Sequence, residues 1–255
     1  MINTKNTGEF TTQNYWENYY EKSAIEVKQV NAICGMYDPL WDKLVNENKS
    51  TAKSKTLIEV GAYPGRYLAY LSKKFNLIPT ALDYNSDKSK IEETFKKFNI
   101  TEFEILIADF IKYTNEKKYD IVISNGFIEH FEDYHSIVKK HSELLKEGGT
   151  MLIMVPNKRY VRKWFDWLCD YDNLKIHNTK CMSKNEFKNF ASDNNLKVIA
   201  IGYFGSFAYN VHQSLNLAQN FIYQSTRFFF RKVNPYISKN PNKYFSSVLY
   251  GIYKK

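Results

Sequence analysis

The sequence predicts an α/β fold, with an open, doubly wound sheet of about seven mostly parallel strands and helices on both faces. Short apolar runs without polar alternation recur between residues 56 and 155, as expected for strands that are buried on both faces. Stretches with helical spacing separate these runs, which indicates right-handed crossovers between parallel strands. A ligand of such a sheet lies beyond the carboxyl ends of the strands, where this chain places glycines and acids.

Each expected strand of the core is a short apolar run bounded by turn residues or acids. These strands are predicted at residues 56–62, 78–84, 103–109, 119–125 and 150–155. Helices are predicted to follow three of them, at residues 64–75, 86–98 and 132–146. Pro64 suits a first helical position, and Gly148-Gly149 suits a helix end.

Segments on either side of this alternation are expected to elaborate a single structural domain. Residues 1–50 are predicted to form a helical lid, with helices at 14–33 and 40–46 and a polar linker at 49–55. Residues 51–204 form the predicted core. After Pro156 the core is expected to contain a basic, aromatic insertion, a capped helix and a sixth strand, at residues 157–182, 183–194 and 196–203. Residues 205–255 are predicted to supply an amphipathic cap helix and an antiparallel closing strand, at 211–230 and 246–253.

Charge and cysteine content indicate what kind of partner the protein binds and in which compartment it works. Residues 156–255 hold 16 Lys and Arg against 5 Asp and Glu, whereas the whole chain has a net charge of +9. This asymmetry indicates an anionic substrate or surface nearby, or else a solvated basic face. Three cysteines without a CxxC pair favour a reducing compartment. The chain shows neither a membrane-length apolar run nor an apolar signal core near its first residue, so a cytoplasmic location is expected.

The segment from Glu59 to Gly65 is predicted to be a strand end followed by a glycine-bearing turn. Glycines at 61 and 65 let the backbone approach a ligand closely. Asp83 ends the next strand about twenty residues on, where an acid can accept hydrogen bonds from both ribose hydroxyls. Tyr63 departs from the G-x-G-x-x-G pattern of dinucleotide sites. The acid at 59 would sit poorly beside a pyrophosphate and suits a cofactor that carries a positive charge.

Five ordered motifs resemble those of class I S-adenosylmethionine-dependent methyltransferases. They are Glu59-x-Gly61-x-x-Pro64-Gly65, Asp83, Asp109, Ser124-Asn125-Gly126-Phe127-Ile128-Glu129-His130 and Leu145-Lys146-Glu147-Gly148-Gly149. The resemblance covers residues 56–156 and, more loosely, 183–203. It implies a Rossmann-like sheet, S-adenosyl-L-methionine as cofactor and S-adenosyl-L-homocysteine as product. It extends loosely to small-molecule methyltransferases of bacterial envelope and sugar pathways, such as capsule or polysaccharide biosynthesis.

The resemblance also implies roles for single residues. Glu59 and the backbone around Gly61 would face the methionine end of the cofactor, and Asp83 would hold the ribose. Asp109 and Phe110 would lie against the adenine. The implied cofactor-binding set is Glu59, Gly61, Ala62, Tyr63, Gly65, Asp83, Tyr84, Asp109, Phe110, Asn125 and Gly126. Many relatives have glycine where Tyr63 stands, so the turn is either wider here or contacts the ligand through this tyrosine.

His130 and Glu129 are the predicted catalytic pair. The resemblance puts Asn125 and Gly126 beside the transferred methyl group, and His130 follows them on the same rim. A neutral imidazole there suits removal of an acceptor proton near pH 7. The alternatives are a structural histidine or a cofactor contact, and Glu129 would orient a partner or bind a substrate cation. His135 and His141 are expected on an exposed helix face. No His, Cys and acid group has the sequence spacing of metal ligands, so no metal site is expected.

The acceptor is expected to lie between the predicted lid and the basic insertion. Its predicted contacts are Tyr15, Tyr19, Arg159, Arg162, Lys163, Trp164 and His177, which combine cations with aromatic faces. Such groups suit a phosphorylated or sugar-like molecule. Residues 205–245 are expected to cap the pocket, to touch an anionic membrane surface, or to pack in the core.

The sequence therefore favours a methyltransferase acting on O or N of a small anionic acceptor, linked to a sugar or nucleotide. An RNA or other nucleic-acid methyltransferase is the alternative enzyme, but Ser124 to Phe127 lacks a Pro-Pro-aromatic element. A non-catalytic S-adenosylmethionine-binding module and an NAD-dependent oxidoreductase also remain open, as does the oligomeric state.

Overall fold

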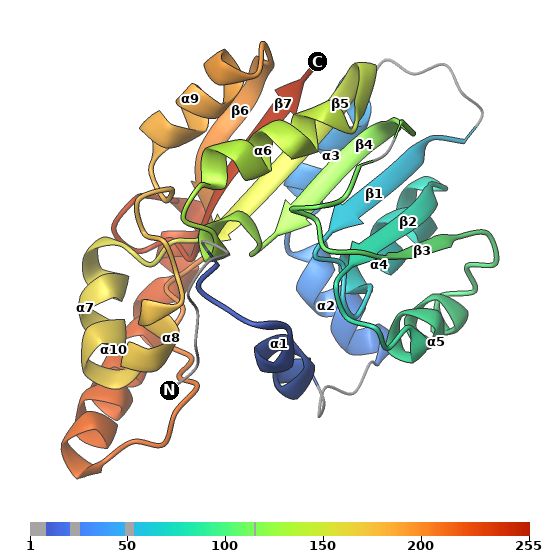
Figure 1. The fold of residues 1–255 in the computed structure, drawn as a ribbon. Helices are drawn as coiled ribbons and strands as arrows, with labels where there is room; N and C mark the ends of the chain where they lie inside the picture. The colour runs from blue at the N-terminus through green and yellow to red at the C-terminus, as the bar shows by residue number, and fades with distance from the viewer. Residues whose placement is uncertain (1–8, 21–25, 49–53, 115) are drawn as a thin grey trace.

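A computed structural model describes residues 9–20, 26–48, 54–114 and 116–255 of the chain, and its sheet confirms the predicted fold class. Seven strands form one sheet in the order β3-β2-β1-β4-β5-β7-β6 (Figure 1). The strands are β1 (Thr56–Val60), β2 (Ile78–Asp83), β3 (Glu104–Ile107), β4 (Tyr119–Asn125), β5 (Leu145–Pro156), β6 (Lys197–Phe204) and β7 (Val248–Lys254). Strands β1 to β5 pair in parallel, and β7 lies antiparallel between β5 and β6.

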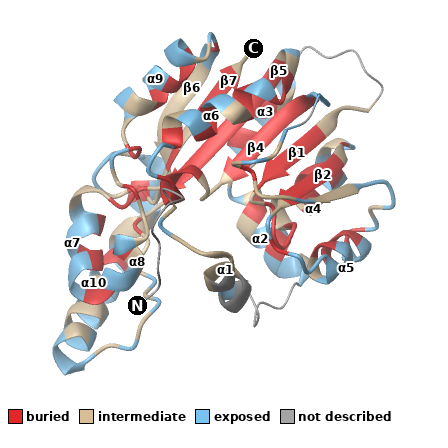
Figure 2. Cartoon of the chain, in the orientation of Figure 1, coloured by how far each residue is buried: buried red, intermediate tan, exposed pale blue. Residues whose placement is uncertain are grey.

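Helices cover both faces of the sheet, which explains why its strands lack polar alternation. Successive residues of one strand enter opposite cores, as Ile121 and Val122 do in β4. One core packs α2 (Val27–Gly35), α3 (Asp38–Glu47), α4 (Arg66–Phe75) and α5 (Ser89–Lys97) on the sheet. The other core packs α6 (Tyr134–Glu143) and α9 (Lys184–Asp193) on the opposite face. Figure 2 shows the resulting band of buried residues along the central strands.

A third apolar cluster builds a lobe beyond the carboxyl ends of the strands. It joins α7 (Tyr160–Cys169) to α10 (Leu217–Lys239), and the short α8 (Tyr171–Lys175) lies beside them (Figure 1). The rings of Phe207 and Phe230 stack with centroids 3.8 Å apart inside this lobe. Helix α1 (Gln13–Tyr20) lies next to the carboxyl ends of the central strands. The lobe and α1 therefore frame the edge where a ligand is expected.

Several element boundaries differ from the sequence prediction for local reasons. The helix predicted at 14–33 is represented by α1 and α2, and residues 21–25 lie outside the described residues, as do 49–53 of the predicted linker. The helix predicted at 211–230 begins at Leu217, because the Asn216 side chain and Gln219 form a reciprocal capping box there. It continues past Pro235 to Lys239. Among the described residues, no helix is both long enough and apolar enough to cross a bilayer.

Candidate cofactor and acceptor sites

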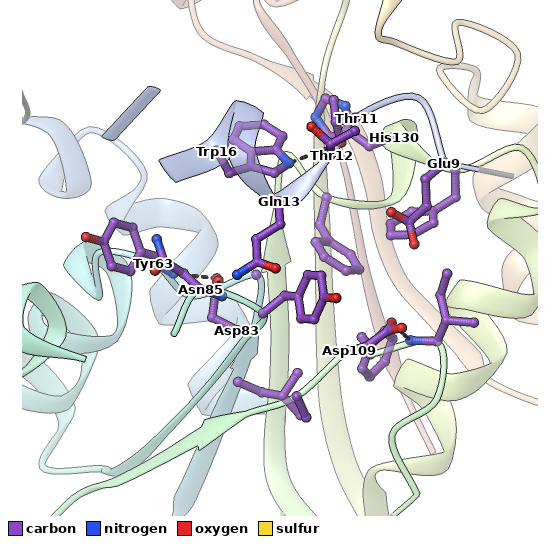
Figure 3. Close-up of a pocket in the computed structure, with 18 of the residues that line it drawn as sticks. Glu9, Thr11, Thr12, Gln13, Trp16, Tyr63, Asp83, Asn85, Asp109 and His130 are labelled. Carbon is purple, nitrogen blue, oxygen red and sulfur yellow. Dashed lines mark hydrogen bonds between the residues drawn. The ribbon is translucent and has the colours of Figure 1, made fainter. Parts of the chain in front are cut away.

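A pocket of about 880 Å³ lies at the carboxyl ends of β1, β2, β3 and β4 (Figure 3). Its walls come from the loops that follow these strands and from the segment that leads into α1. The lining residues are Glu9, Thr11, Thr12, Gln13, Trp16, Gly61, Tyr63, Leu82, Asp83, Tyr84, Asn85, Ala108, Asp109, Phe110, Ile111, Asn125, Gly126, Phe127, His130 and Phe131. Eight of the eleven residues predicted to bind the cofactor are among them.

The turn after β1 requires glycine at position 61. Gly61 has a φ of 72°, and a Cβ there would lie 2.5 Å from the ring of Phe127. Its N–H donates to the carbonyl of Leu82 at 2.9 Å, which ties the turn to the end of β2. The sequence predicted that this glycine leaves room for a ligand. In the structure the missing side chain leaves room for the Phe127 ring, a contact that the sequence did not predict.

Asp83 occupies the centre of the pocket wall in Figure 3. Its Oδ2 accepts the N–H of Tyr63 at 2.9 Å, and its Oδ1 accepts the N–H of Asn85 at 2.8 Å. Burial raises the pKa of the Asp83 carboxyl, although these backbone donors act in the opposite direction. Each oxygen keeps a further lone pair, so the carboxylate can accept from two neighbouring hydroxyls of a ligand.

Asp109 and Phe110 form a second part of the wall. The Asp109 Oδ1 accepts the N–H of Ile111 at 2.9 Å, and its Oδ2 lies 3.2 Å from the Lys112 ammonium. The Phe110 ring contacts Phe127 edge to face, with centroids 5.8 Å apart. An apolar slot with an acceptor at its edge suits a flat heterocycle that carries an amino group.

Glu59, Ala62 and Gly65 were predicted to contact the cofactor but do not line this pocket. Glu59 is 2% exposed, and its Oε1 accepts a hydrogen bond from Asn125 Nδ2 at 2.9 Å. Burial raises the pKa of Glu59 to about 8. Ala62 is buried, and Gly65 packs against Ile91. Glu59 thus stands behind Asn125 and holds the amide that faces the pocket.

The segment before α1 closes one side of the pocket. The N–H of Phe10 donates to the carbonyl of His130 at 2.8 Å, and Glu9 pairs with Phe131 as an isolated β-bridge. The Trp16 indole N–H donates to Thr11 Oγ1 at 3.1 Å, and its ring meets the His130 ring edge to face, with centroids 4.9 Å apart. Sequence reasoning missed Thr11, Thr12 and Gln13 because nothing local marks them as pocket residues.

A second pocket, of about 680 Å³, lies on the other side of Trp16. It is lined by Tyr15, Trp16, Tyr19, Pro156, Asn157, Lys158, Arg162, Asn173, Ile176, His177, Phe207, Ala208, Asn210, His212, Phe245, Ser246 and Ser247. Four predicted acceptor residues are present, namely Tyr15, Tyr19, Arg162 and His177. Trp16 lines both pockets, which makes them neighbours.

The other three predicted acceptor residues lie outside this pocket. Lys163 and Trp164 point to solvent from α7, and Trp164 is 69% exposed. Arg159 directs its guanidinium to the carbonyl of Met182 at 3.4 Å. Helix α7 begins at Tyr160, and its phase turns Arg162 inward and the next two side chains outward.

A buried group of charges forms one wall of the second pocket. The Lys158 ammonium lies 3.0 Å from Asp166 Oδ2, and the Arg162 Nε lies 2.6 Å from Asp166 Oδ1. The Arg162 guanidinium also donates to the carbonyls of Ala208 and Asn210. Two cations thus share one carboxylate, and burial lowers the pKa of the Lys158 ammonium. Lys158 belongs to the basic insertion whose cations the sequence predicted to bind the acceptor.

Glu129, His130 and His177 meet where the two pockets adjoin. Their ligand-type atoms all lie within 4.8 Å of one another, and the two imidazole centroids are 4.7 Å apart. Burial lowers the pKa of His130 to about 4 and that of His177 to about 2, while it raises the pKa of Glu129 to about 8. Sequence spacing gave no sign of this group, because His177 comes from the segment after α8. The three side chains are therefore a candidate ligand set that sequence spacing could not indicate.

His141 is also corrected, since it was expected on an exposed face. It is fully buried on α6, and its ring lies 4.8 Å from that of Phe110. Burial lowers its pKa to about 4, so it is a neutral packing residue behind the adenine-sized slot. His135, by contrast, is half-buried and pairs with Glu186 and Asp193.

The sheet order and the carboxyls after β2 and β3 define the class I S-adenosylmethionine-dependent methyltransferases. The methyltransferase-domain family matches residues 36–201, so the chain belongs to that family. Solved members of similar fold hold S-adenosylhomocysteine, the product of the cofactor S-adenosylmethionine. A coclaurine N-methyltransferase bound to N-methylheliamine and S-adenosylhomocysteine aligns with a TM-score of 0.57 at 14% identity, over 100% of this chain and 79% of that one.

Geranyl diphosphate C-methyltransferase from Streptomyces coelicolor, in complex with Mg²⁺, a substrate analogue and S-adenosylhomocysteine, aligns with a TM-score of 0.60 at 12% identity, over 95% and 97% of the two chains. Among curated proteins, malonyl-[acyl-carrier protein] O-methyltransferase of Priestia megaterium is 31% identical over 49% of this chain and 46% of its own length. Ubiquinone biosynthesis O-methyltransferase of Glaesserella parasuis is 26% identical over 48% and 54%. The chain thus spans about half the length of these relatives.

Proposed function

We propose that this protein transfers a methyl group from S-adenosylmethionine in the first pocket to O or N of a small anionic acceptor in the second. The observation that carries this proposal is the meeting of the two pockets at Trp16, with His130 on one side and His177 on the other. An acceptor in the second pocket would therefore reach the methyl group of a donor in the first. Relatives named as O- and N-methyltransferases support the choice of acceptor atoms.

The donor is proposed to lie across the carboxyl ends of the strands. Asp83 would accept from the ribose hydroxyls, while Asp109 and Phe110 would hold the adenine. Asn125 and Gly126 would face the methionine end, with Glu59 acting through Asn125. The donor carries an already activated methyl group, so the protein has to align the acceptor and manage its proton.

His130 is proposed to take that proton. Its Nδ1 lies 2.8 Å from the carbonyl of Ile176, so Nδ1 carries the hydrogen and Nε2 offers a lone pair. The lowered pKa keeps the imidazole neutral near pH 7. As the acceptor oxygen or nitrogen bonds to the methyl carbon, the carbon–sulfur bond breaks and the proton moves to Nε2. Glu129 Oε1 lies 3.9 Å from Nε2, beside the imidazolium that would form.

The preference for an anion follows from the charges around Asp166. Lys158 and Arg162 both line the pocket beside the Asp166 carboxylate that they share, so their N–H groups are the donors available to an anion there. Tyr15, Tyr19 and Phe207 add aromatic faces on which a sugar or a base can stack. A sugar- or nucleotide-linked acceptor fits both features, and a capsule or polysaccharide pathway is the setting we favour.

Two further proposals concern where the enzyme works. All three cysteines are free and buried, which supports a reducing, cytoplasmic setting. The outer faces of α7 and α10 expose Trp164, Trp167, Phe221, Phe228 and Phe229, with Arg227, Arg231 and Lys232 along the same α10. Such a face suits peripheral contact with an anionic membrane. Sedimentation with vesicles containing phosphatidylglycerol tests this contact, and equal sedimentation of Phe228→Ser/Arg231→Ser would contradict it.

A radiolabelled methyl-transfer screen tests the function itself. Sugar nucleotides, phosphorylated metabolites, lipids and RNA are each offered with labelled S-adenosylmethionine. Transfer to a phosphorylated small molecule is the expected result. Transfer to RNA alone would favour the nucleic-acid alternative. Cofactor binding by calorimetry without transfer to any acceptor class would favour a non-catalytic binding module.

A further inference from the structure

We propose that Glu129, His130 and His177 form a binding site for a divalent transition-metal ion of the zinc class. The three side chains come from two parts of the chain, the turn after β4 and the segment after α8, which fold together at the pocket junction. Two imidazoles and one carboxylate are a donor set that binds such ions with open coordination positions. The site depends on this geometry alone and not on methyl transfer.

Both imidazoles are fixed in the orientation that a metal requires. His130 Nδ1 lies 2.8 Å from the carbonyl of Ile176, and His177 Nδ1 lies 2.6 Å from the carbonyl of Asn173. Each Nδ1 therefore donates its hydrogen to the backbone and leaves Nε2 as the ligand atom. A backbone carbonyl bound to the second ring nitrogen is a common support of metal-binding histidines.

The Glu129 carboxylate supplies the independent observation. It is fully buried, and neither of its oxygens accepts a hydrogen bond from another residue that the structure describes. Its own backbone N–H is the donor that acts on it, and a buried carboxylate with so little support is costly unless a proton or a cation compensates it. Its Oε1 lies 3.9 Å from His130 Nε2, on the side from which an ion would be bound.

The spacing of the three groups is close to that of a loaded site. Tetrahedral ligands at zinc distances lie about 3.3 Å from one another, compared with a spread of at most 4.8 Å here. Side-chain movements that shorten the widest separation by about 1.5 Å would close the set. His177 is the ligand best able to make that shift, since it is half-buried whereas the other two are buried.

The surrounding charges do not exclude a cation. The positive charge of Lys158 lowers the pKa of both imidazoles, but this ammonium lies 3.0 Å from Asp166, which pairs with it. Asp170 adds a second buried carboxylate, which pairs with His212 at 2.8 Å. Lys158 and Asp170 near the junction are therefore each paired with a group of opposite charge, and Glu129 is the carboxylate left to bind an ion.

Three protein ligands leave at least one coordination position for another molecule. Because His130 lines the donor pocket and His177 the acceptor pocket, that position lies between them. If the proposed function holds, the ion would replace His130 as the group that manages the acceptor proton, because His130 Nε2 then binds the ion. An acceptor hydroxyl bound to the ion would lose its proton to solvent more easily, since the ion lowers its pKa. The resulting alkoxide would attack the methyl carbon as the carbon–sulfur bond breaks.

Cobalt(II) is the direct probe of this site. Metal-free protein titrated with Co²⁺ is expected to develop the visible absorption of a four- or five-coordinate ion, and Zn²⁺ should displace it. His177→Ala and Glu129→Gln should each weaken Co²⁺ binding at least tenfold, by calorimetry, with unchanged circular dichroism. His135→Ala is the matched control, because its imidazole also lies beside two carboxylates.

Failure of the metal site and failure of the methyltransferase proposal give different results. No Co²⁺ absorption, or equal binding by the His177→Ala protein, would overturn the metal site, whatever the methyl-transfer screen shows. Should Glu129→Gln fail to fold, the half-buried His177 still decides the question. Co²⁺ binding by a protein that transfers no methyl group would leave the site standing and contradict the proposed function instead.

Discussion

The first pocket, which we propose as the donor pocket, and the second, which we propose as the acceptor pocket, are neighbours, but they are built in different ways. The donor pocket follows the ends of consecutive parallel strands, so its key groups are a glycine turn, Asp83 and Asp109 at fixed points of the sheet. The acceptor pocket gathers α1, α7, the segment after α8 and the loop after β6, which are distant in sequence. One site is set by backbone topology and the other by the packing of added segments.

Under the proposed function, this difference predicts that the donor and the acceptor are recognised by separable parts of the chain. Changes at strand ends should alter cofactor affinity alone, and changes in α7 should alter acceptor affinity alone. Changes in the cluster at the junction should alter the turnover rate and leave the affinities for the donor and for the acceptor unchanged. Substitutions at the junction, in the first pocket and in the second pocket can test that separation.

The largest effect is expected at the junction. His130→Ala should lower kcat by about a hundredfold to ten-thousandfold, because the group that takes the acceptor proton is removed. The affinity for S-adenosylmethionine should stay within about threefold, since the donor contacts remain. Steady-state rates and calorimetry measure the two quantities. His135→Ala is the control, and a fully active His130→Ala enzyme would remove His130 from the mechanism.

The pH dependence of stability should reveal two buried carboxyls, Glu59 behind Asn125 and Glu129 at the junction of the pockets. Glu59 and Glu129 have folded-state pKa values of about 8, above the ordinary value of 4.5. The folded state therefore binds more protons than the unfolded state between these values, and stability should fall as pH rises from about 4.5 to 8. His130, His141 and His177 have lowered pKa values, so stability should also fall as pH drops below about 6.5.

Glu129→Gln should flatten the alkaline limb of that profile. Relative to wild type it should gain roughly 3 kcal/mol in free energy of unfolding between pH 5.5 and 8.5. Urea unfolding at the two pH values measures the difference, with the exposed Glu147→Gln as control. An unchanged slope would show that Glu129 is already ionised in the folded protein at low pH.

Asp83→Asn should weaken binding of S-adenosylmethionine about thirtyfold, because a charged acceptor for the ribose hydroxyls becomes a neutral amide. The acceptor KM should change little if the two pockets are independent. Glu93→Gln, on the exposed face of α5, should leave both constants unchanged. Wild-type cofactor affinity in the Asp83→Asn protein would show that the ligand lies elsewhere in the pocket.

The same contrast explains what the sequence could predict. Asp83, Asp109 and Asn125 were found because buried strands end visibly in a sequence, and parallel strands bring those ends together. The position of Glu59 behind Asn125 was not predicted. The sequence pattern locates the strand, but it does not tell whether a side chain at the strand end faces the pocket or a neighbouring residue. Thr11 and Gln13 were missed because they reach the pocket only through pairing with residues near His130, far along the chain.

Acceptor contacts after Pro156 were predicted from the composition of the segment and not from the position of each residue on an element. Cations and aromatic residues of the insertion were correctly placed near the rim as a group, but the phase of α7 decides which of them turn inward. Lys158, Arg162 and Asp166 recur every fourth residue, and the two cations of this stripe line the pocket while Asp166 pairs with both from behind. Composition alone named Lys158, Arg162 and Lys163 together and could not separate the two inward cations from the outward one.

Lys158→Met, the smallest of the expected effects, tests that stripe directly. It should raise the acceptor KM about tenfold, because one buried hydrogen-bonded cation is lost while Arg162 continues to neutralise Asp166. Lys163→Met removes the same charge from the exposed face of α7 and should change the KM by less than about twofold at moderate ionic strength. Equal effects of the two substitutions would mean that the basic half attracts the acceptor through its overall field. A KM that responds only to Lys158 would mean that the second pocket binds it through a specific contact.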